Sequence, residues 1–169
     1  MTPGPAERFL IGWHDGPRTL LRPLYELADD SSDEIDTYME LGRVLVARDE
    51  HGEIIGHLQL IAGAGAETVE LKSIAVRPDW QARGVGGRLV DRAVAISRDR
   101  GLRTLTVTTA LADLDNLRFY QRCGFRATSI ERDAFTEAKG YPPELRANGI
   151  PVRDSITLTL ALDAPAAGG

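Results

Sequence analysis

The segment Gln81-Ala82-Arg83-Gly84-Val85-Gly86-Gly87 is the stretch of this chain that decides its fold. It follows a run rich in Val, Ile and Leu, residues 69–76, that is typical of a strand, and precedes an amphipathic stretch to Arg100 that is typical of a helix. Glycine lets the backbone approach a ligand closely, and the first amides of a helix carry the positive end of its dipole. The segment therefore predicts a site for a phosphate-bearing ligand.

Length and composition limit the classes of protein to which this chain can belong. Its 169 residues predict a single domain, residues 1–169, with a core over about 8–162 and a disordered tail at 163–169. The one cysteine, Cys123, excludes an intramolecular disulfide, and the three histidines stand apart, so no metal site is expected. The net charge of -5 argues mildly against nucleic acid as a partner.

The N-terminus lacks the charged and apolar regions of a signal peptide. No apolar run approaches the roughly 18 residues that a membrane-spanning helix requires. The sequence therefore predicts a cytoplasmic protein that does not bind membranes.

Strands and helices alternate along the predicted chain, which favours the α/β class. Short apolar runs predict strands at 8–13, 43–48, 53–61, 69–76, 104–109, 125–130 and 156–162. Helical spacing predicts two short pieces within 17–28, separated near Pro23, and helices at 35–41, from the glycine segment to 100, and at 113–123. Residues 131–154 are expected to form a long irregular insertion, which is typical of a functional or mobile loop.

Three phosphate-binding motifs compete for the glycine segment. A Walker loop would need Gly-Lys-Ser/Thr at its end, but Arg88-Leu89 follows here. The dinucleotide fingerprint would need a third glycine where Leu89 stands, and it normally follows the first strand of a fold. Neither of these motifs fits.

The remaining motif is Gln/Arg-x-x-Gly-x-Gly/Ala, which Gln81-x-x-Gly84-x-Gly86 matches completely. Ile74-Ala75-Val76-Arg77-Pro78 precedes it, and Phe119-Tyr120-Gln121-Arg122-Cys123-Gly124-Phe125 follows it. These three motifs, in this order, resemble the GNAT N-acetyltransferases over about residues 8–162. The resemblance implies the GNAT fold, an α/β (α+β) architecture with a mixed, strongly twisted sheet of about six to seven strands flanked by helices.

The resemblance also implies acetyl-CoA as the donor substrate, without a metal. The pyrophosphate would bind the amides of residues 83–87, where Arg83 and Arg88 add positive charge, and the pantetheine arm would pair with the strand before them. The implied cofactor-binding residues are Ile74, Ala75, Val76, Gln81, Ala82, Arg83, Gly84, Val85, Gly86, Gly87, Arg88, Asn116 and Tyr120. Many relatives carry an asparagine where this chain has Asp113. We expect Asn116, one helical turn before Tyr120, to replace it, and the alternative is that this contact is lost.

Two residues are catalytic candidates. Tyr120 stands where the family's tyrosine protonates the coenzyme A thiolate, and the alternative is a tyrosine that only packs in the core. Glu70 stands eleven residues before Gln81, where several members carry a general base, and the alternative is a carboxylate paired with Lys72 or with a cationic substrate. Strict period-2 alternation would place Glu70, Lys72, Ile74 and Val76 on one face of the strand, toward the cofactor.

The expected activity is direct transfer of an acetyl group, in a ternary complex, to a primary amine on a small molecule or peptide. The alternative is a non-catalytic module that binds or senses acyl-CoA. If the C-terminal strand lies at the edge of the sheet, it could pair with the same strand of a second subunit, so a homodimer is one possible assembly. Residues that could contact the acceptor are Trp13, Tyr38, Trp80, Arg132, Asp133, Tyr141, Arg153 and Asp154.

Overall fold

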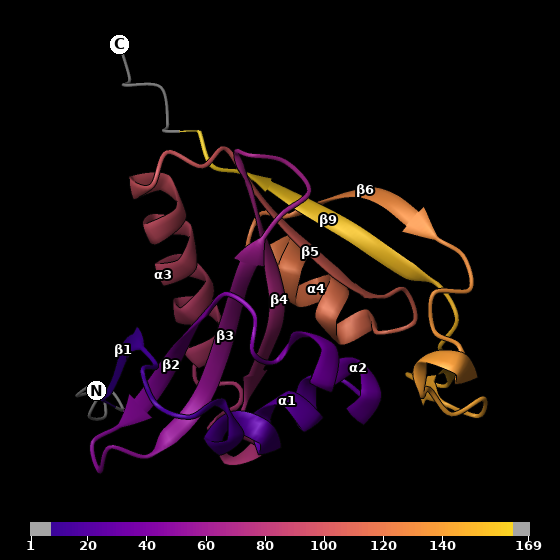
Figure 1. Ribbon diagram of the computed structural model, residues 1–169, viewed down its shortest axis with the longest axis horizontal. Coiled ribbons are helices and arrows are strands. Elements are labelled where there is room, and N and C mark those ends of the chain that lie inside the picture. Colours follow the sequence, from indigo (N-terminus) through magenta and orange to yellow (C-terminus); the bar gives the residue numbers. More distant parts are fainter. Residues whose placement is uncertain (1–7, 164–169) are drawn as a thin grey trace, which may run out of the picture.

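The computed structural model describes residues 8–163 (Figure 1). The strands of the main sheet are β1 (Phe9–Trp13), β2 (Arg43–Asp49), β3 (Ile54–Ala62), β4 (Thr68–Val76), β5 (Thr104–Ala110), β6 (Arg126–Glu131) and β9 (Ser155–Ala161). The α-helices are α1 (Arg22–Ala28), α2 (Ser32–Tyr38), α3 (Val85–Asp99) and α4 (Leu114–Arg122). All but Asp163 of the predicted disordered tail lies outside the described residues.

The main sheet has seven strands in the order β1-β2-β3-β4-β5-β9-β6. Only β4 and β5 run parallel, and the other neighbours are antiparallel, which confirms the predicted mixed sheet. The expectation that the last strand forms an edge is wrong, because β9 inserts between β5 and β6 and pairs with both. The edges are instead β1 and β6.

Helices cover both faces of the sheet (Figure 1). Leu89 and Ala93 of α3 are buried in one core with Leu45, and α3 contacts β2, β3 and β4. Val44 and Val46, whose side chains point the opposite way from Leu45, pack in a second core that includes residues of α1 and α2. The site described below is positioned between these helix layers.

Local signals in the sequence account for several helix boundaries. The 3₁₀ helix η1 (Arg18–Leu21) ends where α1 begins, and Pro23 lies in the first turn of α1, where its missing N–H costs nothing. Ser31 caps α2, because its Oγ accepts a hydrogen bond of 3.2 Å from the Glu34 amide. The two short helical pieces are therefore as predicted.

The insertion at 131–154 is more regular than expected. It contains the 3₁₀ helix η3 (Glu137–Lys139) and a small hairpin of β7 (Arg146–Ala147) and β8 (Ile150–Pro151). Asn148 and Gly149 connect the hairpin with φ values of 52° and 76°. An Asn-Gly pair with positive φ at both residues is the preferred two-residue hairpin turn, so the sequence does contain the signal for this hairpin.

No helix within residues 8–163 is long and apolar enough to cross a membrane. Within the same residues, no three His, Cys, Asp or Glu side chains come together in a way that could hold a metal ion.

Candidate active site

The parallel strands β4 and β5 separate partway along their length. They pair from Thr68↔Thr104 to Leu71↔Val107, whereas β4 stays paired with β3 as far as Val76 and β5 with β9 as far as Ala110. Beyond Leu71, the edge of β4 that faces β5 is therefore without a strand partner. An edge of this kind can pair with an extended ligand through backbone hydrogen bonds.

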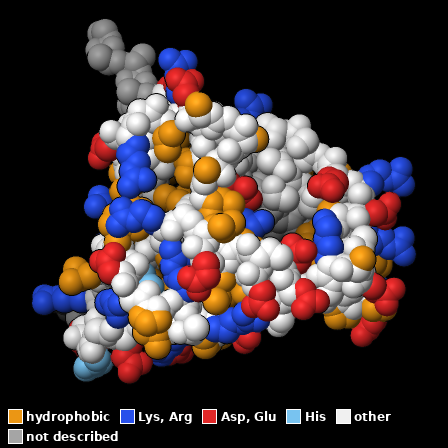
Figure 2. Space-filling view, viewed as in Figure 1, with side chains coloured by type: hydrophobic (Ala, Val, Ile, Leu, Met, Phe, Trp, Pro, Cys, Tyr) orange, Lys and Arg blue, Asp and Glu red, His pale blue; other side chains and the backbone are white. Residues whose placement is uncertain are grey.

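A cavity of about 1120 Å³ opens where the strands separate. It runs from the glycine segment, past β4 and β5, to α1, α2 and the insertion. The space-filling view shows the surface hollowed in this region (Figure 2). Among the predicted cofactor-binding residues, those that line it are Ile74, Ala75, Val76, Gln81, Ala82, Gly84, Val85, Gly86, Gly87, Asn116 and Tyr120.

The glycine segment presents the N-terminus of α3 to the cavity. Gly84 precedes the helix with φ of 81°, a conformation that glycine adopts without strain. The first helical bond runs from the Arg88 amide to the Gly84 carbonyl, at 3.1 Å, so the amides of Val85, Gly86 and Gly87 have no partner within the helix. These amides and the helix dipole can bind an anion.

The other polar groups of this segment have structural partners. Gln81 Nε2 donates to the Val76 carbonyl at 3.0 Å and joins the segment to the end of β4. The Arg83 guanidinium lies 5.1 Å from the centre of the Trp80 ring, and that of Arg88 lies 4.4 Å from the centre of the Phe9 ring. Neither arginine lines the cavity, in contrast to the other residues predicted in this segment.

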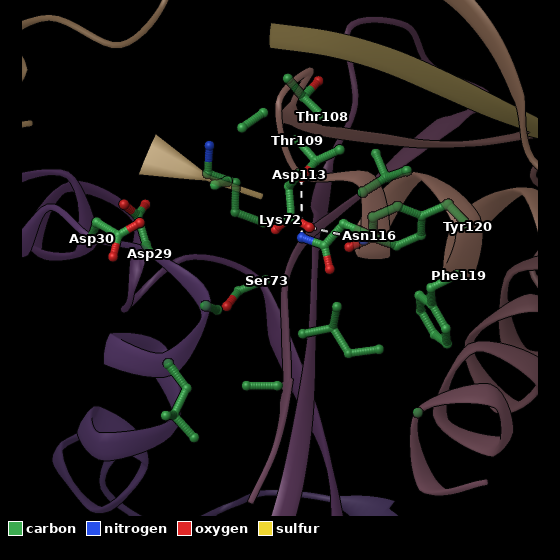
Figure 3. A pocket seen from close by; sticks show the side chains of 18 of the residues that line it. Asp29, Asp30, Lys72, Ser73, Thr108, Thr109, Asp113, Asn116, Phe119 and Tyr120 are labelled. Atoms are coloured by element: carbon green, nitrogen blue, oxygen red, sulfur yellow. Dashed lines mark hydrogen bonds between the residues drawn. The ribbon is translucent and has the colours of Figure 1, made fainter. Parts of the chain in front are cut away.

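Helix α4 supplies a second wall of the cavity (Figure 3). Asp113 caps this helix by accepting from the Asn116 amide at 3.0 Å, and Asn116 Nδ2 donates to Thr109 Oγ1 on β5 at 3.2 Å. Tyr120 is 4% exposed, and its ring packs edge-on against Phe119 and Phe125. Burial, and then the negative charge of Asp113, raise the pKa of Tyr120, so its hydroxyl stays protonated near neutral pH.

A β-bulge in β4 overturns the predicted alternation. The pairing with β3 passes from Leu60↔Leu71 to Gln59↔Ser73 and skips Lys72. Because of this extra residue, Ile74 and Val76 pack against the same core as Leu71 rather than sharing a face with Glu70. Glu70 nevertheless lines the cavity, where its Oε1 lies 3.9 Å from Lys72 Nζ.

The far end of the cavity is formed by α1, α2 and the insertion. Tyr38 and Tyr141 line the cavity here, and Trp80 lines it next to the glycine segment. Trp13 does not line the cavity and instead lies beneath the guanidinium of Arg43. Of the insertion residues singled out in the sequence, only Tyr141 lines the cavity. Arg132, Asp133, Arg153 and Asp154 do not, and Asp154 Oδ1 accepts a hydrogen bond from the Asp133 amide at 2.9 Å.

Sequence reasoning missed several residues of this end. Asp29 and Asp30 lie across the cavity from Asn116 and Tyr120 (Figure 3). Burial and the negative charges of Asp29 and Asp113 raise the pKa of Asp30. The adjacent carboxylates Asp29-Asp30 directly before the cap of α2 were the available signal, but only the fold brings them opposite α4.

Cys123 and the buried histidines His14 and His57 contact other parts of the protein rather than reactive groups. Burial, and then the charge of Asp91, raise the pKa of the Cys123 thiol, which disfavours the nucleophilic thiolate. His57 is fully buried and bonded to Ser73 Oγ at 2.8 Å, and His14 Nε2 lies 3.1 Å from the Pro17 carbonyl oxygen.

Comparison with known proteins relates this geometry to a family. The profile of the Acetyltransferase (GNAT) family matches residues 10–125. The uncharacterized N-acetyltransferase YvbK of Bacillus subtilis is 33% identical over 142 residues, which cover 84% of this chain and 89% of that protein.

Solved structures agree with this relationship. A Bacillus subtilis acetyltransferase in complex with CoA superposes with a TM-score of 0.81 and 32% identity, covering 91% of this chain and 99% of the other. A GNAT family acetyltransferase from Elizabethkingia anophelis with acetyl-CoA bound gives a TM-score of 0.80 and 32% identity. This match covers 90% of the present chain and 97% of the Elizabethkingia chain. With its seven-stranded mixed sheet and its glycine segment at the start of α3, the chain belongs to the acetyltransferase (GNAT) family.

Proposed function

We propose that this protein transfers the acetyl group of acetyl-CoA directly to a primary amine within a ternary complex. The observation that carries the proposal is one continuous cavity that joins the open N-terminus of α3 to the unpaired edge of β4. An acetyl-CoA molecule has the matching parts, a pyrophosphate and an extended pantetheine arm that ends in the thioester.

The residues that would hold the donor follow from this match. The amides of Val85, Gly86 and Gly87 would bind the pyrophosphate, because they lack helical partners and carry the positive end of the dipole. The backbone of Ile74 and Val76 would pair with the pantetheine arm. Asn116 would contact the same arm from α4, where its amide already bridges to Thr109.

The transfer step assigns a role to Tyr120. The amine nitrogen attacks the thioester carbonyl carbon, the carbon–nitrogen bond forms and the carbon–sulfur bond breaks. The departing thiolate takes a proton from the Tyr120 hydroxyl, because Tyr120 lines the same cavity on α4.

The amine must also lose a proton. We propose that Glu70 accepts it, directly or through water, because the Glu70 carboxylate lines the cavity on β4. Its 3.9 Å approach to Lys72 supports the alternative that Glu70 is only an ion-pair partner.

Release of free coenzyme A thiol across a panel of primary amines tests the activity and both roles. Tyr120→Phe should lower kcat by about a hundredfold or more, the usual contribution of a positioned acid. Tyr25→Phe removes a buried hydroxyl from outside the cavity lining and should leave kcat unchanged. Equal activity of Tyr120→Phe and the parent would remove Tyr120 from the mechanism.

For Glu70, the matched control is Glu67, which forms a surface ion pair with Arg103 at 3.5 Å just before β4. Glu70→Gln should lower kcat by about a hundredfold if the carboxylate takes the proton, and Glu67→Gln should not. Unchanged kcat in Glu70→Gln would favour the ion-pair role. Acetyl-CoA binding without thiol release from any amine would favour the non-catalytic binding module instead.

A further inference from the structure

The insertion is fixed against the start of α2 at the acceptor end of the cavity. Asp29 accepts hydrogen bonds from the Tyr38 hydroxyl at 3.0 Å, the Tyr141 hydroxyl at 2.9 Å and the Ser31 amide at 3.0 Å. Ser31 Oγ donates to the Lys139 carbonyl at 2.5 Å. Residues 131–154, here called the acceptor arm, are thereby tied to an element more than a hundred residues earlier in the chain.

Gly140 allows this close approach. A Cβ atom at this position would lie 2.7 Å from Ser31 Oγ and 2.9 Å from Asp33 Oδ2, and φ is +81°. Any other residue would clash and strain the backbone. The packing and the hydrogen bonds together give the acceptor arm a defined position, so the wall that it forms can select a ligand by shape.

The wall that the acceptor arm forms is largely apolar. The Phe135 and Tyr141 rings pack edge-to-face, with centroids 5.0 Å apart, and Leu145 and Val152 extend the same lining. Leu27 of α1, which is 52% exposed, also lines the cavity. Apolar surface on several elements around one cavity favours a ligand with an apolar body.

Carboxylate side chains line the cavity next to this apolar wall. Asp30 and Glu34 line the same end, and neither side chain forms an ion pair within residues 8–163. Within the acceptor arm, the cation Lys139 donates to the Ala134 carbonyl at 3.2 Å, and the cation Arg146, which also lines the cavity, donates to the Gly149 carbonyl at 2.9 Å. Lys72 lies over the Tyr38 ring at 4.8 Å and 3.9 Å from Glu70. The acceptor end therefore offers negative charge to an incoming ammonium group beside an apolar surface.

We propose that the acceptor is a monoamine that carries an aromatic or branched aliphatic group a few bonds from its primary amine. This proposal rests on the acetyl transfer proposed above. The carboxylates attract the protonated amine, and the wall of Phe135, Tyr141, Leu145 and Val152 holds its body. A polyamine would instead place a second ammonium group against that apolar wall. Removing this charged group from water would cost binding free energy.

Thiol release compares phenethylamine, isoamylamine, ethylamine and putrescine under the same conditions. We expect kcat/KM for phenethylamine or isoamylamine to exceed that for ethylamine and putrescine by about tenfold or more, the usual effect of filling an apolar pocket. Phe135→Ala should lower kcat/KM for phenethylamine by about tenfold and change that for ethylamine little. Ile130→Ala, an exposed apolar residue of β6 outside the cavity lining, is the matched control and should change neither.

The outcomes separate this proposal from the one on which it rests. Equal or better use of ethylamine or putrescine would overturn the acceptor class and leave acetyl transfer intact. Binding of acetyl-CoA without acetylation of any of the four amines would also overturn the acceptor class. Failure to bind acetyl-CoA, measured by calorimetry, would instead contradict the proposed function itself.

Discussion

His57 is a titratable residue in the interior of the protein. It is fully buried, its Nε2 bonds to Ser73 Oγ at 2.8 Å, and its ring centroid lies 4.5 Å from that of Tyr25. Its Nδ1 has no hydrogen-bond partner among residues 8–163. Burial lowers the pKa of His57 to about 3. The imidazole is therefore neutral at physiological pH and takes no part in the proposed proton transfers.

This lowered pKa predicts how stability depends on pH. Above pH 6.5 His57 is neutral in both the folded and the unfolded chain, so its contribution is fully present. As the pH falls from about 6.5 toward about 3, only the unfolded chain gains the proton, and the free energy of unfolding drops by about 1.4 kcal/mol per pH unit. His57→Gln should show a correspondingly shallower loss in urea unfolding between pH 7 and pH 5, while His51→Gln, at an exposed position, should keep the parent's slope. An unchanged slope in His57→Gln would contradict this.

Asp29 and Asp30 are adjacent residues, and we expect their replacement by alanine to affect stability differently. Asp29 accepts three hydrogen bonds, so Asp29→Ala should lower the free energy of unfolding by about 1–3 kcal/mol. The raised pKa of Asp30 means that folding disfavours its charge, so Asp30→Ala should not destabilise the protein. Denaturant unfolding at neutral pH measures both, and limited proteolysis should cut the acceptor arm faster only in the Asp29 variant. Equal loss of stability in the two variants would contradict the assigned contacts.

At the scale of elements, the two ends of α3 provide matched glycines. Gly84 at its start and Gly101 just after its end have φ of 81° and 74°. At either position, an added Cβ would have no atom within 4 Å among residues 8–163 other than those of its chain neighbours. Alanine at either position should cost about 1–2 kcal/mol of stability through backbone strain. Gly84 alone lines the cavity, so only Gly84→Ala should also weaken acetyl-CoA binding in calorimetry. Equal acetyl-CoA affinity of the two variants would argue against a pyrophosphate site at this turn.

In strand β4, the sequence predicts the strand itself but not its bulge or its separation from β5. The strand and its flanking turn could be predicted, because Val, Ile and Leu cluster before a proline. The bulge at Lys72 could not, since it depends on pairing with β3, and it reverses the face to which Ile74 and Val76 belong. The separation of β4 from β5 likewise exists only in the assembled sheet.

At the scale of the whole molecule, the sequence predicted the residues that line the cavity near the glycine segment better than those that line it near the insertion. The glycine segment and Tyr120 belong to local motifs, so their neighbours in space could be named in advance. Asp29, Ser31 and Tyr141 meet through contacts between distant parts of the chain, which no local pattern encodes. The position of β9 inside the sheet was missed for the same reason.

Binding of the donor should stabilise the whole fold. Acetyl-CoA at about 100 times its dissociation constant should add about 2.7 kcal/mol to the free energy of unfolding and raise the melting temperature. ATP at the same concentration should add less, because it lacks the pantetheine arm that would pair with β4. A larger shift with ATP would indicate a nucleotide site instead.

The most direct test of the account is a titration of isotope-labelled protein with acetyl-CoA, followed by amide NMR. The account predicts that the amide signals of Val85, Gly86 and Gly87, and those along β4 from Lys72 to Val76, change together and saturate with one affinity. Amides of Gly101 and Leu102, just after the opposite end of α3, should remain unchanged, because these residues do not line the cavity. Changes confined to other surfaces, or none at all, would contradict the central claim that the cavity between β4 and β5 is the acetyl-CoA site.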